Sequence, residues 1–170
     1  MNMDPRLQEA LNDQVTAEYT ASLIYSQISY DLSKMSFSGM SAWMSAQADE
    51  ERLHAGKFSD HLLARNTSVK LSSITLPDLE ITSALEAFTI AYAHEKKVSE
   101  MIRNLARVAD DVRDFDSRTL INWFLQEQIE EEDTVSGIVD QLRMVGDDGA
   151  GQLRIDARLG AERGQAPPAQ

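Results

Sequence analysis

Residues 66–81, NTSVKLSSITLPDLEI, determine how the two halves of this chain can be arranged. The stretch is rich in Ser and Thr and contains Pro77, so it separates two long segments that are free of proline. An extended connection of about 16 residues can run back along the whole length of a long helix. If the flanking segments are helical, the sequence therefore predicts two antiparallel helix pairs joined by one long crossover.

Helical patterns are present on both sides of this connection. Asp4-Pro5 places a capping side chain before a proline at the first helical position, and apolar residues follow at steps of three and four. Ser83 and Glu86 have the spacing of a capping box, which opens the third helix. The predicted helices are 5–34, 40–65, 83–109 and 116–145, with a short fifth helix near 150–160. The predicted tight turns are 36–39 and 110–114.

Four helices of this length predict an all-α fold, a four-helix bundle with a short fifth C-terminal helix. They are more than twice the average helix length of about 11 residues, and such helices need a long partner groove. We assign residues 1–160 to this domain and expect the tail, AERGQAPPAQ at 161–170, to be disordered. On the second helix we place these residues toward the core: Trp43, Ala46, Ala48 and Leu53.

Composition excludes several classes of function. The chain contains no cysteine, which removes disulfides, thiolate metal sites and thiol nucleophiles. Its net charge of −12 disfavours nucleic acid and favours cations as small partners. No stretch approaches the roughly 20 continuous apolar residues that cross a membrane. The N-terminal sequence MNMDPRLQEA lacks the layout of a signal peptide, so we expect a cytoplasmic protein.

Carboxylates occur where the predicted helices should be buried. Glu18 continues the apolar stripe of the first helix, and Glu95 lies midway along the third. Glu51 and His54 form an E-x-x-H pair that faces one way on the second helix. The fourth helix carries four residues that we place on one face, Trp123, Glu127, Glu130 and Glu131, with Gln128 three residues before the last.

Clustered carboxylates are costly to bury because burial and mutual repulsion both oppose their charge, but a bound metal ion reverses this argument. Carboxylates with one or two nitrogen ligands suit iron that keeps positions open for dioxygen. Taken singly, the residues have ordinary explanations: a solvated face for Glu50 and Glu51 or for 130–133, and a surface or core histidine for His54. Only the whole set, level across four helices, favours a metal centre.

Four blocks of the sequence resemble the bacterial non-haem ferritins. They are N-x-Q-x-x-x-E-Y at 12–19, A-D-E-E-R-L-H at 48–54, A-H-E at 93–95 and W-F-L-Q-E-Q-I-E-E-E at 123–132. A single E-x-x-H is weak evidence, whereas all four blocks in this order are specific, and the resemblance covers residues 5–160. It implies a ferritin-like bundle that stores iron, has ferroxidase activity, and assembles as a homo-oligomeric cage of 24 subunits.

The resemblance also implies a role for each candidate residue. The first iron ion would be held by Glu18, Glu51 and His54. Glu51 would bridge to a second iron ion, held also by Glu95 and Glu131, with Gln128 as a weak ligand or hydrogen-bond partner. A third iron position would involve Glu50, Glu127 and Glu130. Tyr25 would supply an electron to the centre, with core packing as its alternative, and for Trp123 core packing is the favoured interpretation.

Departures from related families narrow the prediction. The methionine that binds haem in bacterioferritins would fall at Arg52, so we expect no haem. A mini-ferritin of the Dps type is an alternative, but it would place a histidine on the first helix, where this chain has none. A non-catalytic helical assembly protein with solvated acids is the other alternative. The expected partners are Fe(II) and dioxygen or peroxide, and the sequence leaves open which oxidant acts and whether the subunit assembles alone.

Overall fold

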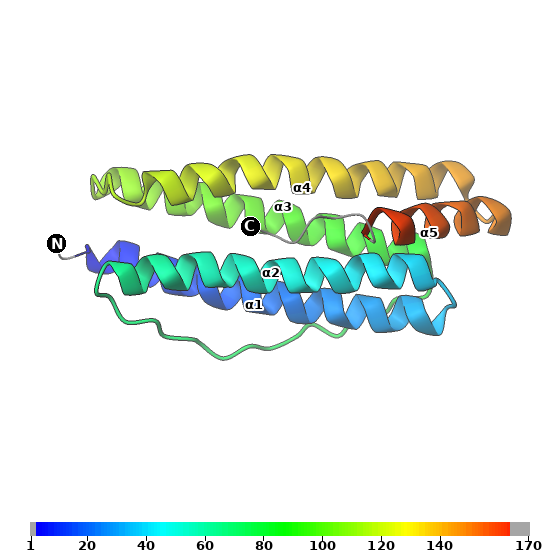
Figure 1. The fold of residues 1–170 in the computed structure, drawn as a ribbon, viewed down its shortest axis with the longest axis horizontal. Helices are drawn as coiled ribbons and strands as arrows, with labels where there is room; N and C mark the ends of the chain where they lie inside the picture. Colours follow the sequence, from blue (N-terminus) through cyan, green and yellow to red (C-terminus); the bar gives the residue numbers. More distant parts are fainter. Residues whose placement is uncertain (1–2, 164–170) are drawn as a thin grey trace.

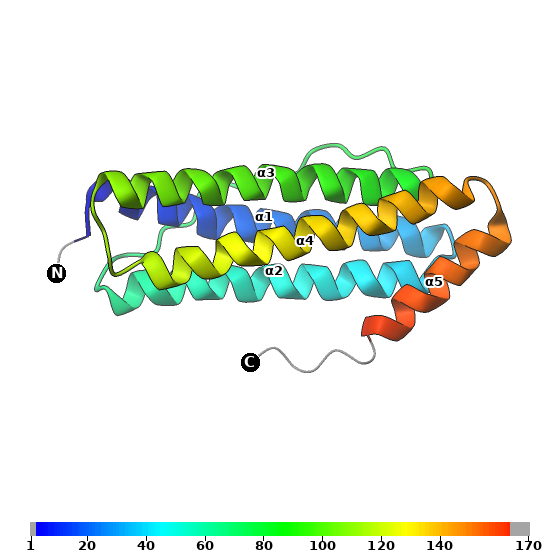
Figure 2. The ribbon, with the colours of Figure 1, turned by 90° about the horizontal axis from the view of Figure 1, so that it is seen from above.

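The computed structural model describes residues 3–163, which form five helices. They are α1 (Pro5–Lys34), α2 (Ser38–Ala64), α3 (Ala84–Asp111), α4 (Arg118–Val145) and α5 (Gly149–Arg163). The first four form a long bundle, with α1 beside α2, α3 beside α4, and the crossover running along the outside (Figure 1). The short α5 folds back from the end of α4 and packs on α2 (Figure 2). The predicted all-α bundle with one long crossover is confirmed.

Capping side chains set the helix starts that the sequence predicts. The Asp4 carboxylate accepts a hydrogen bond from the backbone N–H of Arg6 at 2.9 Å, and α1 has the predicted bounds. The Ser83 hydroxyl accepts the N–H of Glu86 at 3.1 Å, and the Glu86 carboxylate accepts the N–H of Thr82 at 2.8 Å. The reciprocal bonds at the start of α3 fix the end of the crossover.

Other boundaries differ from the prediction by a few residues. Positions 38 and 39, predicted as turn, belong to α2, and α3 continues through Asp111 into the predicted acidic turn. The fifth helix extends to Arg163, so the first three residues of the predicted disordered tail are helical. The rest of that tail, 164–170, lies outside the described residues.

The crossover follows α1 because polar side chains of α1 bind its backbone. The side-chain amide oxygen of Asn12 accepts the N–H of Lys70 at 2.6 Å, and the Thr16 hydroxyl accepts the N–H of Ser72 at 3.1 Å. These bonds satisfy backbone groups that have no partner strand or helix. They hold an irregular segment along the bundle and let α3 start beside the end of α1.

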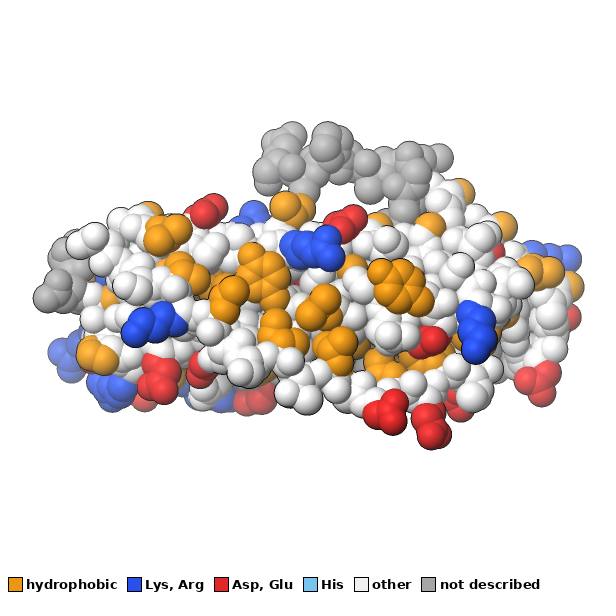
Figure 3. Space-filling view, turned by 90° about the horizontal axis from the view of Figure 1, so that it is seen from below, with side chains coloured by type: hydrophobic (Ala, Val, Ile, Leu, Met, Phe, Trp, Pro, Cys, Tyr) orange, Lys and Arg blue, Asp and Glu red, His pale blue; other side chains and the backbone are white. Residues whose placement is uncertain are grey.

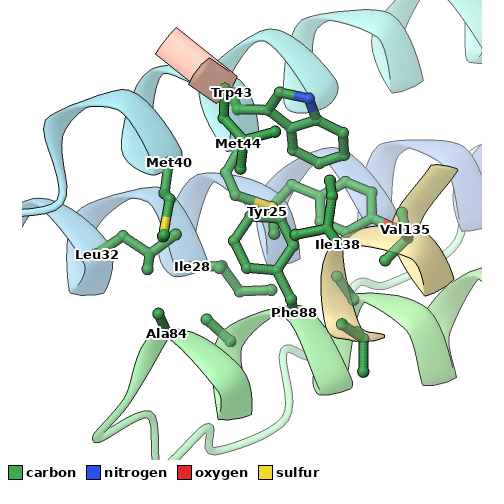
Figure 4. Close-up of a cluster of buried hydrophobic side chains, with 14 of the residues drawn as sticks. Tyr25, Ile28, Leu32, Met40, Trp43, Met44, Ala84, Phe88, Val135 and Ile138 are labelled. Atoms are coloured by element: carbon green, nitrogen blue, oxygen red, sulfur yellow. The ribbon is translucent and has the colours of Figure 1, made fainter. Parts of the chain in front are cut away.

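The core of the bundle is divided into two apolar clusters. One surrounds Tyr25, Trp43 and Phe88 (Figure 4), and the other surrounds Phe58 and Phe124. Each of the helices α1 to α4 contributes residues to both clusters. On every one of them, buried polar residues lie between the residues of the first cluster and those of the second. A polar layer therefore crosses the middle of the bundle between two hydrophobic halves.

The contact of α5 with α2 depends on two glycines and an aspartate. A Cβ atom at Gly39 would lie 1.9 Å from the backbone oxygen of Asp156, and one at Gly160 would lie 3.0 Å from the Gly39 Cα atom. Phe37, which precedes α2, provides no side-chain cap, and instead the Asp156 carboxylate accepts the N–H of Met40 at 2.8 Å. The start of α2 is thus capped from α5.

Two predictions of core position are wrong. Leu53 is 49% exposed and Trp123 is 39% exposed, whereas Trp43 and Ala48 are buried as predicted. Leu53 lies between Glu51 and His54, and with these two facing the core its side chain points away from it. Among residues 3–163, no helix is both long and apolar enough to cross a membrane.

Candidate metal centre

The polar layer contains most of the predicted ligands, one group on each long helix. Glu18 lies on α1, Glu51 and His54 on α2, and Glu95 on α3, each 3% exposed or less. Gln128 and Glu131 on α4 are 5% and 8% exposed. Each residue has apolar core positions before and after it on its helix, which is why the bundle buries it. The fold therefore brings together polar groups from four separate stretches of the chain.

One half of the layer is formed by α1 and α2. Glu18, Glu51 and His54 each offer one ligand atom, and these atoms lie within 4.8 Å of one another. The Nδ1 atom of His54 lies 3.2 Å from Oε2 of Glu51. The Oε2 atom of Glu18 is buried and has no hydrogen-bond partner within residues 3–163. A buried anionic oxygen of this kind requires a proton or a cation.

The other half is formed around Glu95 and Glu131. The Tyr25 hydroxyl donates a hydrogen bond to Oε1 of Glu95, and the Gln128 amide donates to Oε2 of the same carboxylate at 3.1 Å. The Gln128 amide also lies 3.2 Å from the Ser99 hydroxyl. Both oxygens of Glu95 are therefore held by uncharged donors, and its position is defined before any ligand arrives.

Burial and mutual repulsion oppose the ionisation of these carboxyl groups. Burial, followed by the charge of Glu51, raises the pKa of Glu18 well above its ordinary value. Burial, with the charges of Glu95 and Glu131, likewise raises the pKa of Glu51. Burial and the charge of Glu95 raise the pKa of Glu131 to about 9. A metal ion that displaces these protons would supply the charge that the site lacks.

A second group of ligand atoms opens toward solvent. Glu50, His54 and Glu127 offer atoms within 4.8 Å of one another, at the wall of a pocket of about 470 Å³ that also contains Trp123. The ring of Trp123 lies 5.6 Å from that of His54. His54 belongs to both groups, so it connects the buried layer with the pocket.

Glu130, predicted beside Glu127 at a third iron position, is exposed and belongs to neither group of ligand atoms, although its charge acts on Glu127. It accepts a hydrogen bond from Gln126 at 3.2 Å. Successive residues of a helix are about 100° apart, so Glu130 cannot face inward together with Glu131.

Two buried glutamines were given no role from the sequence, although Gln14 lies in the N-x-Q-x-x-x-E-Y block. Gln14 is 2% exposed and donates to Oε1 of Glu18 at 2.7 Å, and Gln47 is 1% exposed and donates to Oε2 of Glu131 at 2.9 Å. The available signal was their spacing, since Gln14 precedes Glu18 by four residues and Gln47 precedes Glu51 by four. Spacing places each beside a ligand of its own helix but does not reveal the bond between α2 and α4.

The donor set fits iron. Carboxylate oxygens predominate, one imidazole contributes nitrogen, and an unpartnered Glu18 oxygen faces the group. This composition is typical of iron sites with positions left open for a further ligand. A set of solvated surface acids, by contrast, would not be buried between two apolar clusters.

Comparison with known proteins agrees with this arrangement. A family model described as the ferritin-like domain matches residues 8–145. The chain is 34% identical over 155 residues to a bacterial non-haem ferritin of Bacteroides fragilis, covering 91% of this chain and 96% of the relative. It is 37% identical over 142 residues to one of Staphylococcus haemolyticus, covering 84% and 86%.

Solved structures give the same result. An open-pore ferritin from the hyperthermophilic archaeon Archaeoglobus fulgidus has a TM-score of 0.91 and 33% identity, covering 94% of this chain and 98% of its own. The family model, the curated relatives and the fold all point to iron storage. This chain belongs to the ferritin family.

Proposed function

We propose that this protein is an iron-storage ferritin that oxidises Fe(II) at a di-iron centre within each subunit and deposits the ferric product inside a 24-subunit shell. Iron is here the substrate and the cargo. The observation that carries the proposal is the layer of four buried glutamates and one buried histidine between the two apolar clusters. Such a layer destabilises the empty bundle, and a cation removes that cost.

The proposed roles follow the two halves of the layer. Glu18, Glu51 and His54 bind one ferrous ion, and Glu95 and Glu131 bind the second. Glu51 bridges them, which is supported by the finding that the charges of both Glu95 and Glu131 act on it. Gln128 orients Glu95 by its hydrogen bond. Two ferrous ions give up two electrons in all, which with two protons reduce one dioxygen to hydrogen peroxide, or one peroxide to water.

Tyr25 is proposed to serve the oxidation step. Its hydroxyl is buried and donates to Glu95, so it lies next to a proposed iron ligand. Burial, followed by the charge of Glu95, raises the pKa of Tyr25 well above its ordinary value, so the neutral phenol persists. A phenol in this position can pass an electron and its proton toward the centre.

A second group, Glu50, His54 and Glu127, is proposed as a third iron position, through which iron enters or leaves the centre, with the nearby Glu130 as a further ligand. The open pocket beside this group supports the assignment. Burial raises the pKa of Glu127, and the nearby charges of Glu50 and Glu130 add to the effect, so a cation binding there relieves repulsion.

Assembly is supported by the face that carries the crossover. Hydrophobic side chains gather on this face (Figure 3), and the exposed ones on α1 and the crossover are Leu23, Tyr30, Leu71, Ile74 and Leu76. Exposed apolar groups in such number are typical of surfaces that bind another protein chain. Closed symmetric assembly of identical chains would cover them.

The test is aerobic addition of Fe(II) to metal-free protein, followed by ferric absorbance and size-exclusion chromatography. We expect fast oxidation, and we expect far more iron than three ions per subunit to elute with a particle of about 450 kDa. Glu51→Gln should abolish fast oxidation and leave assembly intact, whereas Glu80→Gln, on the exposed crossover, should change neither. Oxidation no faster than in buffer, with free ferric precipitate, would reject the proposed function.

A further inference from the structure

Three buried glutamines accompany the buried glutamates of the polar layer. Gln14 donates to Glu18 at 2.7 Å, Gln47 to Glu131 at 2.9 Å, and Gln128 to Glu95 at 3.1 Å. Each glutamine is 5% exposed or less. Only Gln128 is covered by the predicted roles, so the other two amides need an explanation.

An amide side chain suits these positions better than a charged or an apolar side chain would. A lysine or arginine in these places would neutralise the carboxylate and compete with an incoming metal ion, and a further acid would add repulsion. An amide N–H directs a carboxylate while leaving its full negative charge for the metal. An apolar side chain would leave the orientation of the carboxylate undefined.

The two glutamines constrain different parts of the centre. Gln14 lies on α1 four residues before Glu18, so helical geometry alone places its amide over that carboxylate. With Oε1 of Glu18 engaged, Oε2 is the oxygen left without a partner beside Glu51 and His54. Gln47 acts between helices, because it lies on α2 and donates to Glu131 on α4. Burial raises the pKa of Glu51, four residues along α2, and a hydrogen bond from Gln47 partly opposes this rise, so this amide contacts the glutamate that is proposed to bridge the two halves.

We propose that Gln14 and Gln47 are positioning residues, which tether one oxygen of Glu18 and one of Glu131 so that the other oxygen is directed at a metal ion. Gln14 thereby serves the half of the centre that contains His54, and Gln47 serves Glu131 and, through its bond to Glu51, the bridge between the halves. This inference rests on the proposed function. Groups that orient metal ligands typically change metal affinity about 10- to 100-fold when they are removed.

The experiment titrates metal-free protein with Co²⁺, which is stable in air and reports its coordination through visible absorption bands. The variants are Gln14→Met and Gln47→Met, which remove the amide and retain an unbranched side chain of good helix propensity. The control is Gln27→Met, an exposed glutamine of the same helix as Gln14 that donates to Asp31 at 3.2 Å. Gln14→Leu and Gln47→Leu serve as second variants, and circular dichroism and size-exclusion chromatography check folding and assembly.

We expect wild type and Gln27→Met to bind two Co²⁺ tightly. Gln14→Met should keep one tight Co²⁺ and bind the other about 10- to 100-fold more weakly. Gln47→Met should weaken the Co²⁺ held by Glu131 by a similar factor and the other by a smaller one, because Gln47 also bonds the bridging Glu51. The absorption bands lost in the two variants should therefore differ.

Two tight Co²⁺ with wild-type bands in the folded variants would overturn this inference and leave the proposed function standing. A wild-type chain that binds no Co²⁺ would overturn both. A general loss of packing would weaken both Co²⁺ ions equally in each variant, and that result would also reject the assignment of Gln14 and Gln47 to different glutamates of the centre.

Discussion

Replacing Glu131 by glutamine should stabilise the metal-free protein, although the residue is buried. Burial and neighbouring charge raise the pKa of Glu131 from an ordinary value of 4.5 to about 9 in the folded chain. A carboxyl group whose folded pKa is raised binds a proton more tightly when folded, so its contribution to stability is complete below pH 4.5 and is lost as pH rises toward 9.

The structure gives the size of the effect. At pH 7 the carboxyl group is ionised in the unfolded chain, whose ordinary pKa of 4.5 lies 2.5 pH units lower, and is protonated in the folded chain. Each of these units favours the unfolded chain by about 1.4 kcal/mol. Folding at pH 7 is therefore opposed by about 3 kcal/mol at this one position. Glutamine has the same shape, needs no proton, and can present its carbonyl oxygen to the Gln47 amide that now binds the carboxylate.

The assay is denaturant unfolding of metal-free wild type and Glu131→Gln between pH 5 and pH 9 at one protein concentration, because assembly also contributes to stability. The variant should be more stable by up to about 3 kcal/mol at pH 7, and the difference should shrink toward pH 5. Glu9→Gln, at an exposed position of α1, is the control. Added Co²⁺ should stabilise wild type more than the variant.

A variant that is less stable than wild type at pH 7, with an unchanged dependence on pH, would refute the reasoning. It would mean that Glu131 is ionised and satisfied in the empty bundle. The polar layer would then contribute to the fold itself, and its cost would not indicate a metal.

Three further predictions test other parts of the structure. Gly39→Ala should destabilise the protein by about 2 kcal/mol and expose α5 to hydrogen exchange, because the added Cβ would lie 1.9 Å from the backbone of α5. Gly56→Ala, where a Cβ meets nothing within 4 Å, should be neutral or stabilising. Equal losses of stability in the two variants would contradict this account. Tyr25→Phe removes the hydroxyl that donates to Glu95. It should slow ferrous oxidation, followed by stopped-flow absorbance, about tenfold, while the number of bound Co²⁺ ions stays the same. An unchanged oxidation rate would reject the proposed role of Tyr25. Co²⁺ should quench the fluorescence of Trp123, whose ring lies 5.6 Å from that of His54. If Trp123→Phe shows the same quenching, the quenched fluorescence does not come from Trp123 and this prediction is wrong.

The sequence by itself determined the helices and the level of the polar layer. Capping residues and proline act within a few residues of the chain, so α1 and the start of α3 could be predicted closely. Periodicity assigns each residue to a face of its own helix, which was enough to place Glu18, Glu51, His54 and Glu95 inside. The length of the crossover then decided which helices pair.

Only the tertiary structure decided which side chains meet across helices. The bond from Gln47 to Glu131 and the cap from Asp156 to α2 each depend on how one helix is rotated and shifted against another. That rotation is set by the packing of all the side chains at once, and spacing along a single helix carries no record of it. The same reason explains why the core position predicted for Trp123 is wrong. Trp123 lies on the same side of α4 as Glu127, but the rotation of α4 leaves it at the edge of the core, in the wall of the solvent-exposed pocket.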